Sequence, residues 1–207
     1  MLIKNNAVVL FQGDSVTDCG RLSSLDGLGT GYVMQAVSRF MAMYPHKNVK
    51  FINRGISGDR VKDLKRRWQE DCLDLKPDVV SILIGINDCW RRYDSNDPTY
   101  TEDYEKSYRE ILGLTKKELT ANVIILEPFL LPYPEDRDVW REDLDPKIHA
   151  TRKLAREFGA VYIPLDGLFA QASTQKEPAF WAADGVHPTN AGHSLIAQAW
   201  LGAVGVL

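Results

Sequence analysis

The most regular feature of the chain is a series of five short apolar segments rich in β-branched residues, each closed by Gly, Pro, Asp or Asn. The segments are Ala7–Gln12, Val49–Asn53, Val79–Ile84, Val123–Glu127 and Ala160–Pro164. Their hydrophobicity is continuous rather than alternating, which is typical of strands that are buried on both faces of a parallel sheet. We therefore predict five strands of one buried sheet.

Segments with helical spacing lie between these runs. Their apolar stripes are Tyr32, Val33, Ala36, Val37, Phe40 and Met41 in the first, Val61, Leu64, Trp68 and Cys72 in the second, Tyr104, Tyr108, Ile111 and Leu112 in the third, and Leu144, Ile148, Leu154 and Phe158 in the fourth. Thr99-Tyr100-Thr101-Glu102 has the pattern of a capping box for the third helix. Gly159 is placed to end the fourth helix, and a last helix is expected from about Thr189 to Leu201.

This alternation of strands and helices indicates the fold class. It predicts right-handed βαβ connections and hence an α/β fold, a three-layer α/β/α sandwich around a five-stranded parallel sheet. No break in composition, linker or repeat divides the chain, so we expect residues 1–207 to form a single domain. Two segments, Tyr93–Pro98 and Pro128–Asp138, are the loops long and polar enough to shape a binding site.

The composition is that of an ordinary globular protein, and it excludes several classes of partner. The chain has 207 residues, of which 44% are hydrophobic, and a formal net charge of −3. The lack of a basic block argues against nucleic acid bound through its phosphates. Cys19, Cys72 and Cys89 have no Cys-x-x-Cys spacing, which argues against structural zinc and a disulfide scaffold and favours a reduced, intracellular chain.

The start of the chain gives no sign of export. Met1–Asn6 is too polar for the core of a signal peptide, and the apolar run Ala7–Phe11 is too short. No stretch approaches the roughly 20 apolar residues of a membrane span. We therefore expect a cytoplasmic protein with no membrane partner.

Small and polar residues follow the predicted strands. They are Gly13-Asp14-Ser15 after the first, Arg54–Asp59 after the second, Gly85-Ile86-Asn87-Asp88 after the third, and Asp184-Gly185-Val186-His187 near the C-terminus. Ligands of open parallel sheets gather at the carboxyl ends of the strands. The first three groups are therefore expected at one rim of the sheet.

Each group has an ordinary structural explanation when it is taken alone. Gly-Asp-Ser after a strand is usually a turn that starts a helix, with the Asp or Ser side chain as its cap. Gly55 and Gly58 can simply supply a positive φ, and Asn87 can bond its own backbone in a turn. His187, before a proline, can be a surface loop residue. We expect a structural or solvated role for the remaining histidines, His46, His149 and His193.

Taken together, the groups supply every chemical group that acyl transfer by a serine nucleophile requires. A serine hydroxyl becomes a good nucleophile when a histidine accepts its proton, and that imidazole needs a carboxylate to orient it. Ser15, His187 and Asp184 provide these three groups. The developing oxyanion needs preorganised donors, and the Ser15 N–H, the Gly58 N–H and the Asn87 side-chain amide are available at the strand ends.

In this order, and over nearly the whole chain, these residues resemble the SGNH or GDSL-type hydrolase family. The resemblance implies a flavodoxin-like sheet, with Ser15 as nucleophile, His187 as base and Asp184 as the residue that orients it. It also implies an oxyanion hole built from Ser15, Gly58 and Asn87, and a reaction that needs no cofactor or metal ion. Val16 stands where the motif that names the family has leucine, but other members carry β-branched residues there.

The sequence around these anchors is similar to the carbohydrate-esterase branch of the family. The similar segments are Gly13–Arg21, Asn53–Gly58 and Ile84–Arg91. Members of this branch remove acetyl groups from xylan or xylo-oligosaccharides. The resemblance therefore implies a serine esterase for short-chain acetyl esters of such sugars, with a small-molecule or oligosaccharide ester as its partner.

Aromatic residues near the anchors are candidates for substrate binding. Trp90 and Tyr93 follow Asn87, and Trp181 precedes Asp184 by three residues, so their faces are available to stack on pyranose rings. An equally weighted alternative is that Trp181 packs beneath the His187 loop and that Trp140 caps a helix. We expect Arg91 and Arg92 to be solvated or to pair with Asp94 and Asp97.

Three other classes of function stay open at this point. A lipid or thioester hydrolase of the same fold differs from an acetylesterase in its dependence on acyl-chain length. A non-catalytic flavodoxin-like module could bind phosphate through Gly13-Asp14-Ser15, although a Walker-type Gly-Lys pair is lacking. A metallohydrolase would use Asp14, Asp88 and His187, but we expect the two aspartates to order the strand-end turns. Exposed aromatics are compatible with a homo-oligomer.

Overall fold

The computed structural model describes residues 1–207 and contains one sheet in which all neighbouring strands are parallel. Its strands are β1 (Val8–Gly13), β2 (Lys50–Asn53), β3 (Val79–Leu83), β4 (Asn122–Leu126) and β5 (Val161–Ile163). Every boundary lies within one residue of the boundary predicted from the apolar runs. The five-stranded parallel sheet is therefore confirmed.

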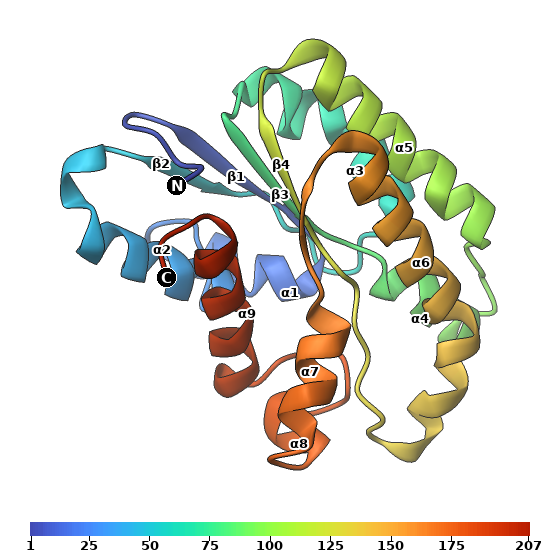
Figure 1. Cartoon of the computed structure of the whole chain (residues 1–207). Coiled ribbons are helices and arrows are strands. Elements are labelled where there is room, and N and C mark those ends of the chain that lie inside the picture. The colour runs from blue at the N-terminus through green and yellow to red at the C-terminus, as the bar shows by residue number, and fades with distance from the viewer.

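Helices cover both faces of this sheet, which confirms the α/β class and the three layers (Figure 1). One face packs against α2 (Tyr32–Met43), α7 (Leu165–Ser173) and α9 (Asn190–Ala203). The other packs against α3 (Val61–Asp71), α5 (Thr101–Glu118) and α6 (Arg141–Phe158). Three short helices, α1 (Ser15–Asp18), α4 (Ile86–Asp94) and α8 (Pro178–Trp181), complete the set.

The central strand β3 shows why a continuous apolar run predicts such a sheet. All five of its residues are buried. Val79 and Leu83 belong to the core cluster on the α2–α9 side, whereas Val80 and Ile82 belong to the cluster on the α3–α5 side. Because successive side chains point to opposite faces, both faces demand apolar residues. Ser81 is the polar exception, and its hydroxyl oxygen accepts a hydrogen bond from the Trp200 indole at 3.0 Å.

The helix ends agree with the sequence except at the start of α5. Gly159 ends α6 with a φ of +65°, and the Thr189 side chain caps α9. The predicted capping box at Thr99 is wrong, because α5 begins at Thr101 and its N-cap, Tyr100, makes no side-chain cap bond. The Thr99 hydroxyl instead accepts a hydrogen bond from the Arg60 guanidinium.

The two segments predicted as loops are partly helical. Tyr93 and Asp94 form the end of α4, so the first loop is shorter than expected. In the second, residues 128–134 are irregular, and Glu135–Trp140 forms a 3-10 helix that leads into α6. This second segment still forms a long connection beside the carboxyl end of the sheet.

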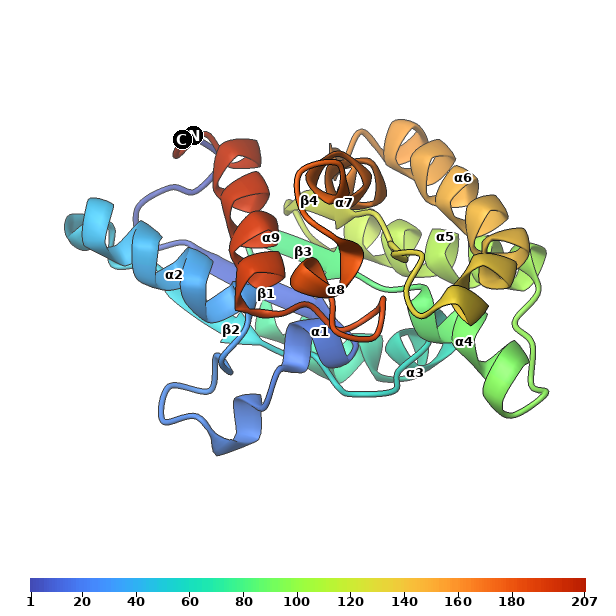
Figure 2. The same ribbon diagram turned by 90° about the horizontal axis from the view of Figure 1, so that it is seen from below.

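The order of the strands fixes where a ligand can bind. The order is β2-β1-β3-β4-β5, so the direction of progression along the sheet reverses between β1 and β3. This is the flavodoxin-like order, and ligands of such sheets bind in the crevice at the carboxyl ends of the strands beside the reversal. The chain continues from β1 into α1 and from β3 into α4 at that point. The two termini lie together elsewhere, with the Leu2 N–H donating to the Val204 carbonyl (Figure 2).

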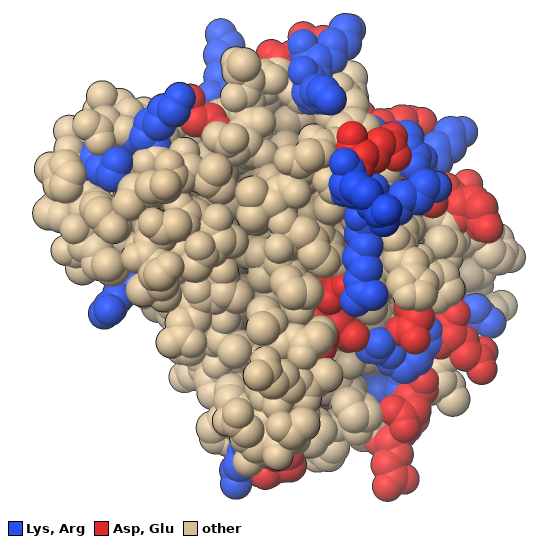
Figure 3. Space-filling model, viewed as in Figure 1, with Lys and Arg blue, Asp and Glu red and all other residues tan.

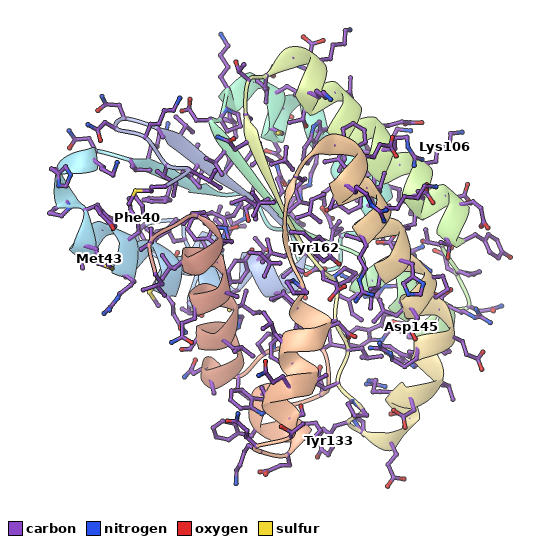
Figure 4. All side chains as sticks on the ribbon, viewed as in Figure 1. Phe40, Met43, Lys106, Tyr133, Asp145 and Tyr162 are labelled. Atoms are coloured by element: carbon purple, nitrogen blue, oxygen red, sulfur yellow. The ribbon has the colours of Figure 1, made fainter.

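The surface is unevenly charged. Lys, Arg, Asp and Glu gather over α5 and α6, whereas the face over α2 and α9 in the same view is largely uncharged (Figure 3). The sequence explains this, because α9 contains no charged residue. On α2, Phe40 is buried and Met43 is exposed, as the labelled side chains in Figure 4 illustrate. None of the helices is both long enough and apolar enough to span a bilayer.

Candidate active site

The turn after β1 places Ser15 at the start of a helix. Gly13 ends the strand, and a Cβ there would lie 2.3 Å from the Thr17 hydroxyl oxygen, so only glycine fits. The Asp14 carboxylate caps α1 by accepting a hydrogen bond from the Val16 N–H at 3.1 Å. Ser15 is the first residue of α1, and its own N–H has no acceptor within that helix or among the turn and loop bonds. The serine therefore offers both a hydroxyl and a free N–H.

The turn after β2 brings a second free N–H to this rim. Gly58 has a φ of +88°, as predicted, and its N–H donates to no backbone acceptor in the turn. The expected positive φ at Gly55 is wrong. Glycine is needed there because a Cβ would lie 2.3 Å from the Asp18 backbone nitrogen, so the turn packs directly against α1. The Asn53 side chain fixes this approach by accepting a hydrogen bond from the Gly55 N–H at 2.9 Å.

Asn87 supplies a third donor from the first turn of α4. It does not bond its own backbone in a turn, the alternative that the sequence suggested. Its side-chain Nδ2 donates to the Asp59 carbonyl at 3.1 Å, and its Oδ1 accepts from the Arg91 guanidinium at 3.3 Å. An amide nitrogen carries two hydrogens, so the second remains available for a ligand.

A tight turn near the C-terminus joins Asp184 to His187. One carboxylate oxygen of Asp184 accepts hydrogen bonds from the N–H groups of Val186 and His187, at 3.0 and 2.7 Å. The other lies 2.7 Å from Nδ1 of the His187 ring. Gly185 has a φ of +82°, and a Cβ there would lie 2.1 Å from the Tyr133 carbonyl. The three-residue spacing thus produces a locally built carboxylate–imidazole pair.

The structure brings this pair to the nucleophile candidate. The Ser15 hydroxyl lies 3.0 Å from Nε2 of His187, although 172 positions separate the two residues. The hydrogen bond with the Asp184 side chain raises the pKa of His187 above its ordinary value of 6.5, against the opposing effect of partial burial. Burial raises the pKa of Asp184, but hydrogen bonds from His187 and Val186 outweigh it, leaving that pKa well below its ordinary value. The histidine has the geometry and electrostatics of a base oriented by a carboxylate.

Two further carboxylates, those of Asp14 and Asp88, lie under the rim and accept hydrogen bonds from backbone N–H groups. Asp14 caps α1, and Asp88 accepts a hydrogen bond from the Val61 N–H at the start of α3, at 3.0 Å. Burial raises the pKa of each to about 7. The prediction that they order strand-end turns is confirmed. Together with His187 they do not form a cluster of side chains that could hold a metal ion.

Of the three aromatic candidates, Trp90 lies beside the site. Its ring centroid is 5.8 Å from that of His187. Tyr93 instead stacks on Trp140 at 5.1 Å and donates its hydroxyl to the Val139 carbonyl. Trp181 packs against the main core and donates its indole N–H to the Lys176 carbonyl, which agrees with the packing alternative.

The two arginines of α4 agree with the expectation that they are solvated or pair with Asp94 and Asp97, because Arg91 forms one of these pairs and Arg92 is exposed. Arg91 pairs with Asp94. Arg92 pairs with Asp143 of α6 at 3.5 Å rather than with Asp94 or Asp97. Asp97 pairs with Arg60. Arg92 therefore links the helix that carries Asn87 to α6, whereas the Arg91 pair lies within α4.

Sequence reasoning missed the support that residues 130–140 give to the turn that carries Asp184 and His187. The Arg137 guanidinium lies 4.2 Å above the Trp140 ring and 5.6 Å from the Trp90 ring, and its Nε donates to the Asp184 carbonyl at 3.3 Å. The Leu131 N–H donates to the Gly185 carbonyl at 2.9 Å. The length of the loop was the only signal, and no motif singles out Arg137.

Comparison with known proteins places these features in a family. Residues 11–195 match the GDSL-like Lipase/Acylhydrolase family. An acetylxylan esterase from Geobacillus stearothermophilus is 38% identical over 214 residues, which cover 99% of this chain and 97% of that protein. Its crystal structure has a TM-score of 0.91 at 37% identity, covering 99% of this chain and 97% of that one.

Two further groups of solved structures are similar. A protein from Parabacteroides merdae assigned as a GDSL-like lipase has a TM-score of 0.94 at 36% identity, covering 99% of this chain and 98% of that one. Other structures are catalytic mutants of the Geobacillus enzyme in which a serine, an aspartate or a histidine is replaced by alanine. That enzyme is also described as an acetyl-xylooligosaccharide esterase.

Proposed function

Because this chain belongs to the GDSL-like lipase/acylhydrolase family and is a carboxylic ester hydrolase, we propose that it is a serine esterase for acetyl groups on xylo-oligosaccharides or related sugars. The observation that carries the proposal is the Ser15–His187–Asp184 arrangement, with contacts of 3.0 and 2.7 Å. Residues 1–207 act as one catalytic domain in this proposal.

The proposed reaction has two steps. Ser15 attacks the ester carbonyl while Nε2 of His187 accepts its proton, and the tetrahedral intermediate collapses to an acyl-enzyme and a free sugar hydroxyl. His187 returns the proton to the leaving oxygen. It then takes a proton from water, which attacks the acyl-enzyme. When this second tetrahedral intermediate collapses, acetic acid is released and His187 returns the proton to the Ser15 oxygen. Asp184 holds the imidazole and stabilises its protonated form in both steps.

The oxyanion of both steps is stabilised by donors that are already in place. The Ser15 N–H, the Gly58 N–H and the second hydrogen of the Asn87 amide come from the ends of three strands and have no other acceptor. Preorganised donors of this kind cost no reorganisation when the negative charge develops, which is why they lower the barrier.

The shape of the site supports a short acyl group. None of the five main cavities includes Ser15, Gly58, Asn87 or His187. One apolar cavity is lined by Val16, Ile86 and Val186, which are the sequence neighbours of Ser15, Asn87 and His187. Its volume is only about 10 Å³. A long acyl chain requires an apolar channel to bury its methylene groups. The lack of such a channel among these five cavities supports an acyl group as short as acetyl.

The sugar preference rests on Trp90 and on the relatives. The Trp90 ring is half-buried next to His187, where its face can contact a pyranose whose ester oxygen is at Ser15. The Geobacillus relative, which is described as an acetyl-xylooligosaccharide esterase, has the same fold at 37% identity. Tyr93 and Trp181 are weaker substrate-binding candidates, because neither ring is in aromatic contact with His187, as the Trp90 ring is.

Substitution of Ser15 tests the reaction, and a substrate panel tests the specificity. Ser15→Ala should lower kcat on p-nitrophenyl acetate by roughly 10⁴–10⁶ and abolish labelling by a fluorophosphonate. Ser38→Ala, at an exposed serine of α2, is the matched control and should retain full activity. Full activity of Ser15→Ala would overturn the mechanism.

In the panel, kcat/KM should fall from acetyl to butyryl to octanoyl esters of p-nitrophenol. It should be higher for acetylated xylo-oligosaccharides than for aryl acetates. A rise with acyl-chain length would favour a lipase, and a lower value for the acetylated sugars would remove the carbohydrate assignment.

A further inference from the structure

The turn that carries Gly58 is fastened on both sides by the helices that carry the other two oxyanion donors. On one side, Oδ2 of Asp18 accepts hydrogen bonds from the Ser57 hydroxyl at 2.8 Å and from the Ser57 N–H at 3.3 Å. On the other side, the Asn87 amide donates to the Asp59 carbonyl at 3.1 Å. Gly58 lies between these two attachments.

Backbone hydrogen bonds hold the turn on either side of this point, from the Ile56 N–H to the Gly13 carbonyl at 3.0 Å and from the Asp59 N–H to the Ile56 carbonyl at 3.2 Å, but Ser57 and Gly58 make none themselves. Ile56, Ser57 and Gly58 are all exposed, and a Cβ built at Gly58 would meet no atom within 4 Å. A glycine with a φ of +88° in open space has more conformational freedom than any other residue. The direction of its N–H therefore depends on the residues attached to either side. A displacement of about 1 Å in a positioned group can cost roughly 10² in rate.

Asp18 is well placed to provide a rigid attachment. It ends α1, one helical turn after Ser15, and its side chain is only 20% exposed. Its other oxygen, Oδ1, accepts from the Arg21 N–H at 3.2 Å and lies 3.8 Å from Nε of Arg21. Both carboxylate oxygens are therefore engaged. The Arg21 cation also offsets a negative charge that would otherwise oppose an oxyanion nearby.

We infer that Asp18 is a positioning residue for ester hydrolysis, and that it fixes the Gly58 N–H relative to Ser15 by binding Ser57. We call this contact the Asp18–Ser57 clasp. The inference rests on the proposed function, because it assigns the clasp to the oxyanion hole proposed above. Asp18 does not touch the reacting atoms, and it acts through Ser57 and Gly58.

Steady-state kinetics on p-nitrophenyl acetate test the clasp. Asp18→Ala should lower kcat by about 10- to 100-fold, less than the loss of a whole donor, with a change in KM below about threefold. Asp18→Asn should recover most of the loss, because its amide oxygen still accepts from Ser57. Ser57→Ala should lower kcat by about threefold. The double variant should be no slower than Asp18→Ala, since Ser57 acts through Asp18.

A tetrahedral inhibitor separates oxyanion stabilisation from a general structural role. Binding of a boronic acid, whose serine adduct carries negative charge, should weaken in Asp18→Ala by about the same factor as kcat. The matched control is Asp26→Ala, because Asp26 accepts a hydrogen bond from the Leu28 N–H at 2.9 Å in the same segment and makes no contact with the Gly58 turn. Its kcat and inhibitor affinity should equal those of the wild type.

The outcomes distinguish the clasp from the reaction itself. Active-site titration with a fluorophosphonate gives the concentration of folded enzyme for each variant. An unchanged kcat in Asp18→Ala, independent losses that multiply in the double variant, or an unimpaired boronic acid affinity would overturn the clasp. If Asp18→Ala does not fold, an unchanged kcat in Ser57→Ala overturns it. Retained activity in Ser15→Ala would instead overturn the proposed function.

Discussion

Two histidines six positions apart, His187 and His193, show how one side chain takes two roles in neighbouring regions. His187 lies in the turn before α9, with 46% of its side chain exposed and its two ring nitrogens next to Ser15 and Asp184. His193 lies in the first turns of α9 and is buried. Its Nδ1 accepts a hydrogen bond from the Tyr32 N–H at 3.1 Å.

Because their surroundings differ, the two histidines have different pKa values. The hydrogen bond with Asp184 raises the pKa of His187, whereas burial without a carboxylate partner lowers the pKa of His193 to about 4. His187 can therefore accept a proton from a serine hydroxyl near neutral pH. His193 stays neutral and acts as a backbone acceptor that holds the start of α2 against α9. The comparison teaches that the partner of the ring, rather than the presence of a histidine near the site, determines the chemistry.

The largest expected effect is the loss of activity when His187 is removed. His187→Ala should lower kcat on p-nitrophenyl acetate by roughly 10⁴–10⁶, because no other group lies within reach of the Ser15 proton. Its thermal unfolding temperature should remain close to that of the wild type, since the ring is half-exposed. His193→Ala, the paired control, should retain kcat within about twofold per folded molecule. A loss below tenfold in His187→Ala would contradict the assignment of the base.

The next effect is the pH dependence of the wild type. His187 must be neutral to accept a proton, so kcat/KM should fall as the pH drops through its pKa, with a midpoint above 6.5. The charged groups that influence this ring are Asp184 and, from the turn after β1, Asp14, and both favour the protonated form.

NMR titration of the imidazole signals sharpens the same comparison. One signal, identified by its absence in His187→Ala, should titrate above 6.5. The His193 signal should titrate only near pH 4. A kinetic midpoint below 6.5, or a His193 signal that titrates with that of His187, would show that the two environments are not as different as the structure indicates.

The sequence could predict those parts of the fold and the site that a short segment of the chain, or a general rule of parallel sheets, determines. The strands are marked by continuous apolar runs because both faces of the sheet are buried, as β3 shows. The Asp184–His187 pair is encoded within four residues, and the position of Ser15 follows from the rule that the carboxyl ends of parallel strands share one rim.

The parts that sequence could not predict depend on contacts between distant segments. Arg137 reaches the Asp184 carbonyl across 47 positions, and Asn87 reaches the Asp59 carbonyl across 28. Neither contact has a local pattern. The prediction that His193 is structural or solvated is correct. Its position in a helical segment did not indicate which of the two roles it has, because its hydrogen-bond donor, the Tyr32 N–H, lies 161 positions away in the sequence.

The smallest expected effect is on stability, at His193. His193→Ala leaves the buried Tyr32 N–H without an acceptor and removes a packed ring, which should lower the free energy of unfolding by about 1–3 kcal/mol at pH 7.5. His193→Asn, whose Oδ1 can stand in for Nδ1, should recover part of the loss. Denaturant unfolding measures both values, and an unchanged stability of His193→Ala would contradict the proposed hold on α2.

The sign of the pH effect gives this last prediction a second, independent check. The folded pKa of His193, about 4, lies below its ordinary value of 6.5, so the unfolded chain binds more protons between those values. The stability that neutral His193 contributes is therefore fully present above about pH 6.5 and is lost as the pH falls toward 4. The gap in stability between wild type and His193→Ala should narrow over this range. A gap that stays constant would mean that the substitution acts through packing alone and not through a buried neutral imidazole.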